Sequence, residues 1–101
     1  AGTIEQNESI EACVFRELEE ETGYMAKKIR KLVSCYTSPG YSSEILHIYL
    51  AEDLIKTASK NEEDEVLEVV KMKMDDALEL VKSNLIIDAK TILALQCYMN
   101  L

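Results

Sequence analysis

Three carboxylates near the end of one predicted helix are the residues of this sequence best suited to chemistry. They are Glu17, Glu20 and Glu21. On an ideal helix they fall within the same sector, about 100° wide, as the apolar Ile10, Cys13 and Val14. A face that should pack against a core therefore turns acidic, at the end where the helix dipole is itself negative. Each such placement costs about 0.3 to 1 kcal/mol, so a positive group should compensate the repulsion.

A solvated acidic face is the alternative, because charge runs on helices usually face water. Such a face would lie opposite Ile10 and Cys13 rather than in line with them, and Arg16 is the only cation within the helix. Hard oxygen ligands on adjacent turns suit Mg²⁺ or Mn²⁺, with water or phosphate oxygens completing an octahedron. The sequence therefore favours a divalent-metal site that handles phosphate.

The composition argues against several classes of partner. Nineteen Asp and Glu against eleven Lys and Arg give a net charge of -8, which repels nucleic-acid backbones and anionic lipid heads. No window approaches the roughly eighteen apolar residues of a membrane span. Cys13, Cys35 and Cys97 are odd in number and widely spaced, which argues against a disulfide framework or a thiolate metal site. We therefore expect a cytoplasmic domain that binds neither nucleic acid nor membrane.

The elements that must position the glutamates come early in the chain. Their helix begins at Asn7, a potential N-cap, and ends before Gly23, which can adopt the left-handed conformation of a helix stop. Two apolar runs, 29–36 and 44–51, predict strands that are joined by a turn segment at 37–43. The first half of the chain is thus expected to be a helix followed by a hairpin.

The second half is expected to complete one domain over residues 1–101. The polar, aperiodic stretch 52–64 predicts a loop, and the apolar stretch 65–72 predicts a third strand. Asp75 and Asp88 can each cap a short helix. Helices combined with a small sheet indicate an α/β or α+β layered domain.

Residues 2 to 24 also follow a spacing known from one enzyme family. The fixed positions are Gly2, Glu8, Arg16, Glu17, Glu20, Glu21 and Gly23, with apolar-type residues at Leu18 and Tyr24. In this pattern the chain resembles the Nudix hydrolases. The resemblance implies an α/β/α sandwich with a mixed sheet. Because the family has several strands before the motif, it also implies that this chain is an N-terminally truncated fragment.

The resemblance further implies roles for individual residues. The implied metal ligands are Glu17, Glu20, Glu21 and the carbonyl oxygen of Ala1. Arg16 would orient the glutamates, Glu8 would brace the loop, and Gly2 and Gly23 would be structural. The implied reaction is hydrolysis of a nucleoside diphosphate linked to another group. Mg²⁺ or Mn²⁺ would be the cofactor, because a cation that bridges two phosphates stabilises the leaving group and activates water.

A second resemblance concerns the turn segment. The ADP-ribose pyrophosphatase branch carries a proline fifteen or sixteen residues beyond the motif, and Pro39 lies fifteen residues after Tyr24. The implied substrate-binding residues are Pro39, Gly40, Tyr41, Ser42 and Glu44. A plain hairpin turn is the alternative for Pro39 and Gly40. The expected substrate is ADP-ribose, cleaved to AMP and ribose 5-phosphate. The alternatives are NADH, a UDP-sugar or a dinucleoside polyphosphate as substrate, or a catalytically idle interaction module.

Three further expectations concern the base, the histidine and the assembly. The branch places its general base on a loop before a late strand, where Glu65 is the first candidate and Glu63 the second. His47, the only histidine, is expected to pack within its strand, because no Ser or Cys lies beside it in sequence. The branch also has an N-terminal segment that swaps between subunits, which implies a homodimer for the full-length protein.

Overall fold

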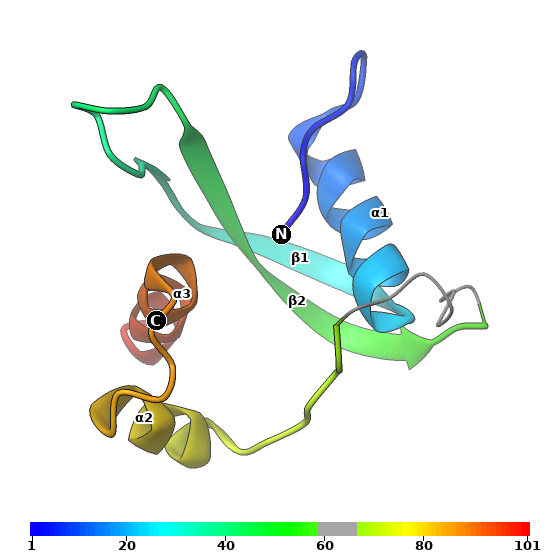
Figure 1. The fold of residues 1–101 in the computed structure, drawn as a ribbon. Coiled ribbons are helices and arrows are strands. Elements are labelled where there is room, and N and C mark those ends of the chain that lie inside the picture. The colour runs from blue at the N-terminus through cyan, green and yellow to red at the C-terminus, as the bar shows by residue number, and fades with distance from the viewer. Residues whose placement is uncertain (59–66) are drawn as a thin grey trace.

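The computed structural model describes residues 1–58 and 67–101 and places a two-stranded hairpin between helices (Figure 1). The elements are α1 (Ile10–Thr22), β1 (Tyr24–Tyr36), β2 (Ile45–Lys56), α2 (Met74–Lys82) and α3 (Ala89–Met99). Helix α1 lies on one side of the hairpin, and α2 and α3 lie on the other (Figure 1). The predicted α+β class, with helices on both sides of a sheet, is confirmed.

Local chemistry sets both ends of α1. The Ser9 hydroxyl accepts a hydrogen bond from the Ala12 N–H at 3.1 Å, so Ser9 is the N-cap rather than Asn7. Asn7 instead has a φ of 62°, outside the helix. At the other end Gly23 has a φ of 75°, and its N–H donates to the Glu19 carbonyl at 2.9 Å. The predicted stop is confirmed, and the predicted cap was placed two residues too early.

The hairpin is longer than the sequence predicted. Its antiparallel register runs from Tyr24 opposite Lys56 to Tyr36 opposite Ile45. Residues 52–56, predicted as loop because they are polar, extend β2. The correction has a simple cause: ladder hydrogen bonds are made by backbone groups, so a polar segment continues a strand when a partner strand lies beside it.

The predicted third strand is wrong over residues 67–72, which form neither helix nor strand. Residues 65 and 66 lie outside the described part. Within the described residues the sheet has two antiparallel strands, so its mixed character is not found there. Leu67 and Val70 are 54% and 63% exposed. The segment has the composition of a strand, but a ladder also requires a neighbour, and no described strand lies beside it.

The two C-terminal helices begin differently. The Asp88 carboxylate accepts a hydrogen bond from the Thr91 N–H at 3.0 Å, which confirms the predicted cap of α3. The N-cap of α2 is Lys73, whose side chain makes no capping bond, and Asp75 lies in the first turn, where the dipole favours an acid. The prediction of Asp75 as a cap was therefore wrong. Among the described helices, none is long and apolar enough to cross a membrane.

The core of the described residues is small. Its buried apolar side chains are those of Cys13, Ala26 and Ala77, and no large side chain is fully buried in this part of the chain. Cys13 belongs to α1 and Ala26 to β1, two elements that pack against each other. The helix that carries the glutamates is thus anchored where the described fold is best buried.

Candidate functional site

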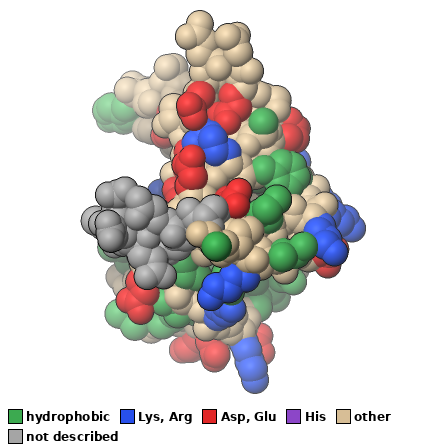
Figure 2. All heavy atoms as spheres, turned by 90° about the vertical axis from the view of Figure 1, so that its right-hand side faces the viewer, with side chains coloured by type: hydrophobic (Ala, Val, Ile, Leu, Met, Phe, Trp, Pro, Cys, Tyr) green, Lys and Arg blue, Asp and Glu red, His purple; other side chains and the backbone are tan. Residues whose placement is uncertain are grey.

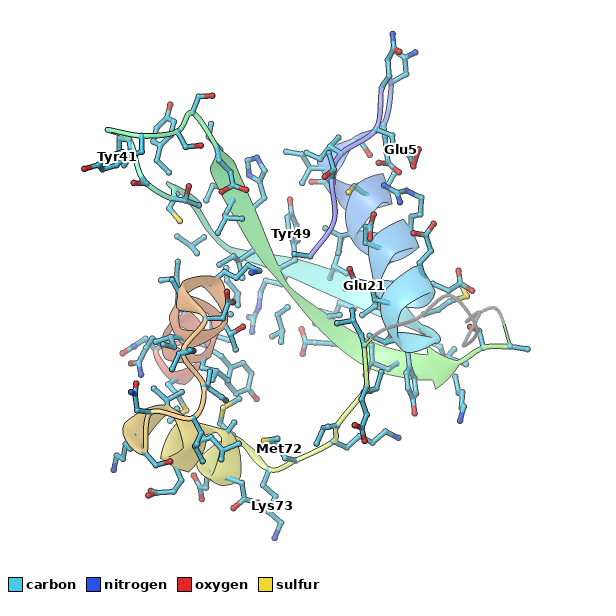
Figure 3. All side chains as sticks on the ribbon, in the orientation of Figure 1. Glu5, Glu21, Tyr41, Tyr49, Met72 and Lys73 are labelled. Carbon is cyan, nitrogen blue, oxygen red and sulfur yellow. The ribbon has the colours of Figure 1, made fainter. Side chains whose placement is uncertain are left out.

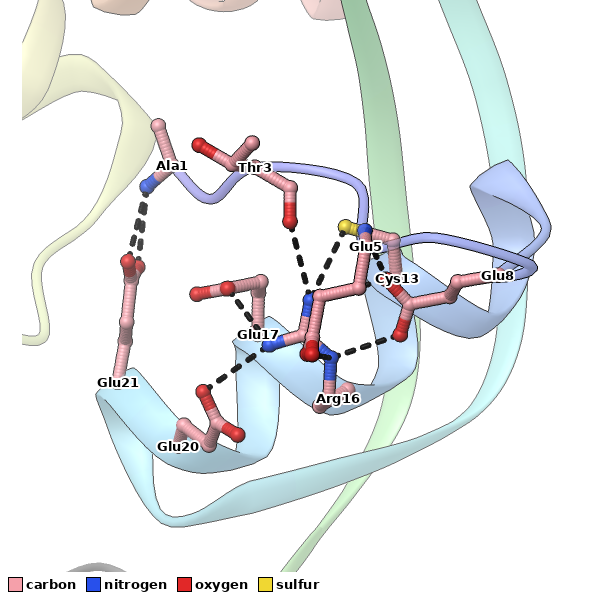
Figure 4. Close-up of polar contacts among 9 residues, drawn as sticks. All are labelled: Ala1, Thr3, Glu5, Glu8, Cys13, Arg16, Glu17, Glu20 and Glu21. Carbon is pink, nitrogen blue, oxygen red and sulfur yellow. Dashed lines mark hydrogen bonds and ion pairs between the residues drawn. The ribbon is translucent and has the colours of Figure 1, made fainter.

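Arg16 is the centre of the polar contacts that join the N-terminal segment to α1 (Figure 4). Its Nε donates to Glu8 Oε2 at 2.7 Å and its Nη2 to Glu8 Oε1 at 2.9 Å, which makes the pair bidentate. Nη2 also donates to the Thr3 carbonyl at 3.1 Å, and Nε lies 3.1 Å from Glu5 Oε1. One guanidinium therefore ties the loop before the helix to the helix itself.

The same guanidinium holds two of the predicted metal ligands. Its Nη1 donates to Glu17 Oε1 at 2.8 Å and lies 3.3 Å from Glu20 Oε2. The Glu21 carboxylate contacts the nitrogen of Ala1 instead, at 3.0 and 3.2 Å. In the space-filling view, acidic side chains gather around a basic group on the face that carries α1 (Figure 2). Glu17 and Glu20 thus share one positive partner, Arg16, which offsets part of their mutual repulsion.

These contacts shift ionisation equilibria in the direction that Coulomb's law requires. The hydrogen bonds from Arg16, followed by that from the Glu5 N–H, lower the pKa of Glu8 from 4.5 to about 2. The bonds to Glu8 raise the pKa of Arg16 further above its ordinary value. Burial, and then the Glu8 charge, raise the pKa of the Cys13 thiol. Glu8 and Arg16 therefore stay ionised near neutral pH, and Cys13 stays protonated.

Gly2 lies directly against the Glu17 side chain. A Cβ placed on Gly2 would overlap Cγ, Cδ and Oε1 of Glu17. Only glycine lets the backbone pass this close to the carboxylate. The glycine of the sequence pattern therefore has a physical role here, because any side chain would displace a predicted metal ligand.

The predicted metal ligands are all oxygen donors, which suits a hard cation, but their side chains do not converge on one position. Carboxylate and carbonyl oxygens are the ligands that Mg²⁺ and Mn²⁺ prefer. Within residues 1–58 and 67–101, however, no three His, Cys, Asp or Glu side chains lie close enough to hold a metal ion. Arg16 Nη1 contacts one oxygen of Glu17 and one oxygen of Glu20, so the second oxygen of each carboxylate stays available to a cation. The Glu20 side chain is 57% exposed, so solvent weakens its contact with Arg16.

A cavity of about 570 Å³ lies between the N-terminal segment, α1 and β2. Ala1, Glu17 and Glu21 line it from one side, and Glu44 and His47 line it from the hairpin. Its volume lies within the range of small-molecule sites. Two predicted metal ligands from α1 thus face the same space as one predicted substrate residue from the hairpin.

A hydrogen bond connects the two walls of this cavity. Tyr49 lies between β2 and α1 (Figure 3), and its hydroxyl donates to Glu11 Oε1 at 3.1 Å. Burial and this bond raise the pKa of Tyr49. Tyr49 therefore links β2 to α1 as a neutral phenol.

The residues predicted to bind substrate are not brought together around the cavity as the residues of the motif are. The N–H groups of Tyr41 and Ser42 both donate to the Ser38 carbonyl, at 2.9 and 2.8 Å, which closes a tight turn. Tyr41 is 95% exposed and extends from the hairpin tip (Figure 3). Glu44 lines the cavity, and its Oε1 accepts a hydrogen bond from the Thr37 hydroxyl at 3.0 Å. Of the five predicted substrate residues, Glu44 alone lines the cavity; the others are Pro39, Gly40, Tyr41 and Ser42.

Three further residues that the sequence singled out have different outcomes. Glu63 and Glu65, the candidates for the general base, lie outside the described residues. His47 has a polar neighbour that sequence adjacency did not reveal, because Ser34 Oγ lies 2.7 Å from its Nδ1 across the hairpin. The predicted turn was not precise enough to find this pair: counting outward from residues 37–43 places Ser34 opposite Leu46, whereas the observed register is shifted by one residue and pairs Ser34 with His47.

Residues 1–95 match the NUDIX domain family. The chain belongs to the Nudix family. The predicted resemblance is therefore confirmed well beyond the motif, which covers only residues 2 to 24. Nudix hydrolases generally use divalent metal ions.

Two named relatives and one solved structure are similar to this chain over nearly its whole length. The chain is 50% identical over 103 residues to the ADP-ribose pyrophosphatase of Bacillus subtilis (strain 168), covering 100% of this chain and 55% of that protein. It is 44% identical over 99 residues to the GDP-mannose pyrophosphatase of Yersinia pestis (strain Pestoides F), covering 95% and 50%. A crystal structure of an ADP compounds hydrolase matches with a TM-score of 0.85 at 27% identity, over 98% of this chain and 54% of that one. The Nudix chain thus spans about half the length of these relatives.

Proposed function

We propose that this chain contributes the metal-binding motif and part of the substrate cavity of a Nudix pyrophosphohydrolase that converts ADP-ribose into AMP and ribose 5-phosphate. The observation that carries the proposal is the shared cavity, in which Glu17 and Glu21 face Glu44 from the hairpin. The 50% identity to an ADP-ribose pyrophosphatase supports the choice of substrate.

In this proposal Glu17, Glu20, Glu21 and the Ala1 carbonyl hold Mg²⁺ or Mn²⁺. A cation held there would supply positive charge for the diphosphate and would lower the pKa of the attacking water. Arg16 holds Glu17 and Glu20 in place before the cation binds, and Glu8 holds Arg16. Gly2 leaves room for the Glu17 carboxylate.

The remaining steps belong to the substrate side of the cavity. Glu44 presents a carboxylate that can accept hydrogen bonds from sugar hydroxyl groups. Water attacks one phosphorus, the bond to the bridging oxygen breaks, and the water proton passes to a carboxylate. Glu65 is the proposed acceptor and Glu63 the second candidate. Pro39, Gly40, Tyr41 and Ser42 are proposed to approach the substrate from the hairpin tip.

A second substrate has specific support. The GDP-mannose pyrophosphatase relative is 44% identical, and its name indicates a nucleoside diphosphate sugar. Both substrates share a diphosphate between two sugars, so the same cation site would serve either. Product analysis with ADP-ribose, GDP-mannose, NADH and a UDP-sugar separates the two proposals from other Nudix activities and from an idle module.

The assembly and compartment are also proposals. Met25 and Ile55 pair across one end of the hairpin and are each about half exposed, at 49% and 48%. This apolar surface supports a homodimer of the full-length protein, which sedimentation velocity would test. The three cysteines are free, which supports the reducing cytosol.

The decisive test is the turnover of ADP-ribose by full-length protein with and without Mg²⁺. Glu17→Gln and Glu21→Gln should each abolish most turnover while circular dichroism stays unchanged. Glu79→Gln is the matched control, because Glu79 is an exposed glutamate on α2 that does not line the cavity. Full turnover in either cavity variant would contradict the metal assignment.

A further inference from the structure

The pair formed by Ser34 and His47 sits on the cavity side of the hairpin. The two residues are directly opposite in the ladder, and Ser34 Oγ lies 2.7 Å from His47 Nδ1. His47 lines the cavity, whereas Ser34 does not. The serine therefore engages the ring from within the sheet and leaves Nε2 as the ring nitrogen available to a ligand.

The other side chains that line the cavity indicate what His47 Nε2 could bind. The charged side chains that line the cavity are Glu17, Glu21 and Glu44, and no Lys or Arg is among the lining residues. A diphosphate has to be held in this acidic surrounding. Tyr49, the other ring donor on this wall, already donates to Glu11. His47 is therefore the lining side chain that can offer a nitrogen-bound proton to a phosphate oxygen.

We propose that His47 is a substrate-contacting residue, oriented by Ser34, whose Nε2–H donates a hydrogen bond to a phosphate oxygen of the bound diphosphate. In this proposal the Ser34 hydroxyl, 2.7 Å from Nδ1, is the donor of that contact, so the ring carries its proton on Nε2. The inference rests on the proposed function for the identity of the ligand. It departs from the expectation that His47 only packs within its strand.

Two amide substitutions separate the two ring nitrogens. The Asn amide reaches the position of Nδ1, so His47→Asn keeps the contact with Ser34 and loses the donor in the cavity. The Gln amide reaches the position of Nε2, so His47→Gln keeps a donor in the cavity. Ser34→Ala keeps the imidazole but removes its orienting bond.

The measurement is calorimetric binding of the α,β-methylene analogue of ADP-ribose to full-length protein in the presence of Mg²⁺. We expect His47→Asn to bind about tenfold more weakly, the usual effect of losing one hydrogen bond to a charged group. His47→Gln should stay within about threefold of the wild type, and Ser34→Ala should fall between the two. Turnover of ADP-ribose should show the same order in KM with little change in kcat.

The outcomes distinguish this inference from the proposed function. Equal affinity of His47→Asn and the wild type would overturn the role of His47, even if the wild type hydrolyses ADP-ribose. Equal weakening in the Asn and Gln variants, with matching losses in thermal stability, would also overturn it and indicate packing. A wild type that binds the analogue but hydrolyses no substrate would contradict the proposed function while leaving the binding order as the test of His47.

Discussion

The motif segment, residues 1–24, and the hairpin tip, residues 37–44, are the two regions that the sequence singled out, and they are built differently. In the motif segment nearly every predicted residue contacts another one: Arg16 bonds to Glu8 and Glu17, and Gly2 lies against Glu17. At the hairpin tip the backbone closes on itself at Ser38, and Glu44 alone of the predicted residues lines the cavity.

The difference indicates which residues are preorganised. In the motif segment Arg16 holds Glu8, Glu17 and Glu20 before any ligand is present, so the positions of these side chains follow from the chain itself. The residues of the hairpin tip satisfy turn geometry, and their proposed contacts would form only with a substrate. Changes in the motif segment should therefore lower both the thermal stability of the retained fold and the turnover, whereas changes at the tip should affect substrate binding.

The largest contrast is expected between two glycines. Gly2→Ala should lower kcat by more than about 100-fold, because the new Cβ displaces the proposed metal ligand Glu17. Loss of a residue that only orients a metal ligand typically costs about 10- to 100-fold, and displacement of the ligand itself should cost more. Gly40→Ala should change kcat less than twofold, because a Cβ there meets nothing within 4 Å. Steady-state kinetics with ADP-ribose measures both. Similar effects of the two substitutions would remove the distinction between the regions.

Replacement of Arg16 by lysine tests whether the network depends on its forked geometry. An ammonium group cannot make the bidentate contact with Glu8 while also holding Glu17, so Arg16→Lys should lower kcat by about 10- to 100-fold. Arg30→Lys on β1 serves as the matched control, since Arg30 is exposed and does not line the cavity. A fully active Arg16→Lys variant would show that charge alone suffices.

At the hairpin tip the effects should appear in KM. Glu44→Gln should raise KM for ADP-ribose by about tenfold through a weakened hydrogen bond to the sugar, with kcat nearly unchanged. Tyr41→Ala should raise KM less, because Tyr41 is 95% exposed and does not line the cavity. The reverse order would indicate that the tip rearranges to bring Tyr41 onto the substrate.

The smallest effect concerns the pH dependence of stability. The pKa of Glu8 falls from 4.5 to about 2 on folding, so its ion pair stabilises the fold fully above pH 4.5. That contribution is lost as the pH decreases toward about 2, where Glu8 takes up a proton in the folded state as well. Thermal unfolding of the wild type and Glu8→Gln should therefore differ most near neutral pH and converge toward pH 2. A constant difference across this range would contradict the ion pair.

The sequence predicted those features that local chemistry decides. The stop at Gly23 and the cap at Asp88 follow from the conformations and side chains of single residues, and both were correct. The alignment of the glutamates along α1 also followed from helical spacing. The partners of these glutamates did not, because the position of Arg16 relative to the N-terminal loop depends on how that loop returns to the helix.

Features that depend on distant partners were harder to predict. Residues 52–56 became strand because β1 lies beside them, whereas the more apolar 67–72 did not. Composition predicted a loop for residues 52–56 and a strand for residues 67–72. It failed in both segments because composition describes side chains, whereas the hydrogen bonds of a sheet are made by the backbone. The contact between Ser34 and His47 likewise required the hairpin register, which the sequence specified only approximately.

The central claim is that Glu17 and Glu21 hold a divalent cation at the diphosphate. Its most direct test is anomalous diffraction at the manganese edge from crystals of the full-length protein grown with Mn²⁺ and the α,β-methylene analogue of ADP-ribose. We predict an anomalous peak within bonding distance of both carboxylates and of a phosphate oxygen. An analogue bound in the cavity with no manganese beside these glutamates would contradict the account.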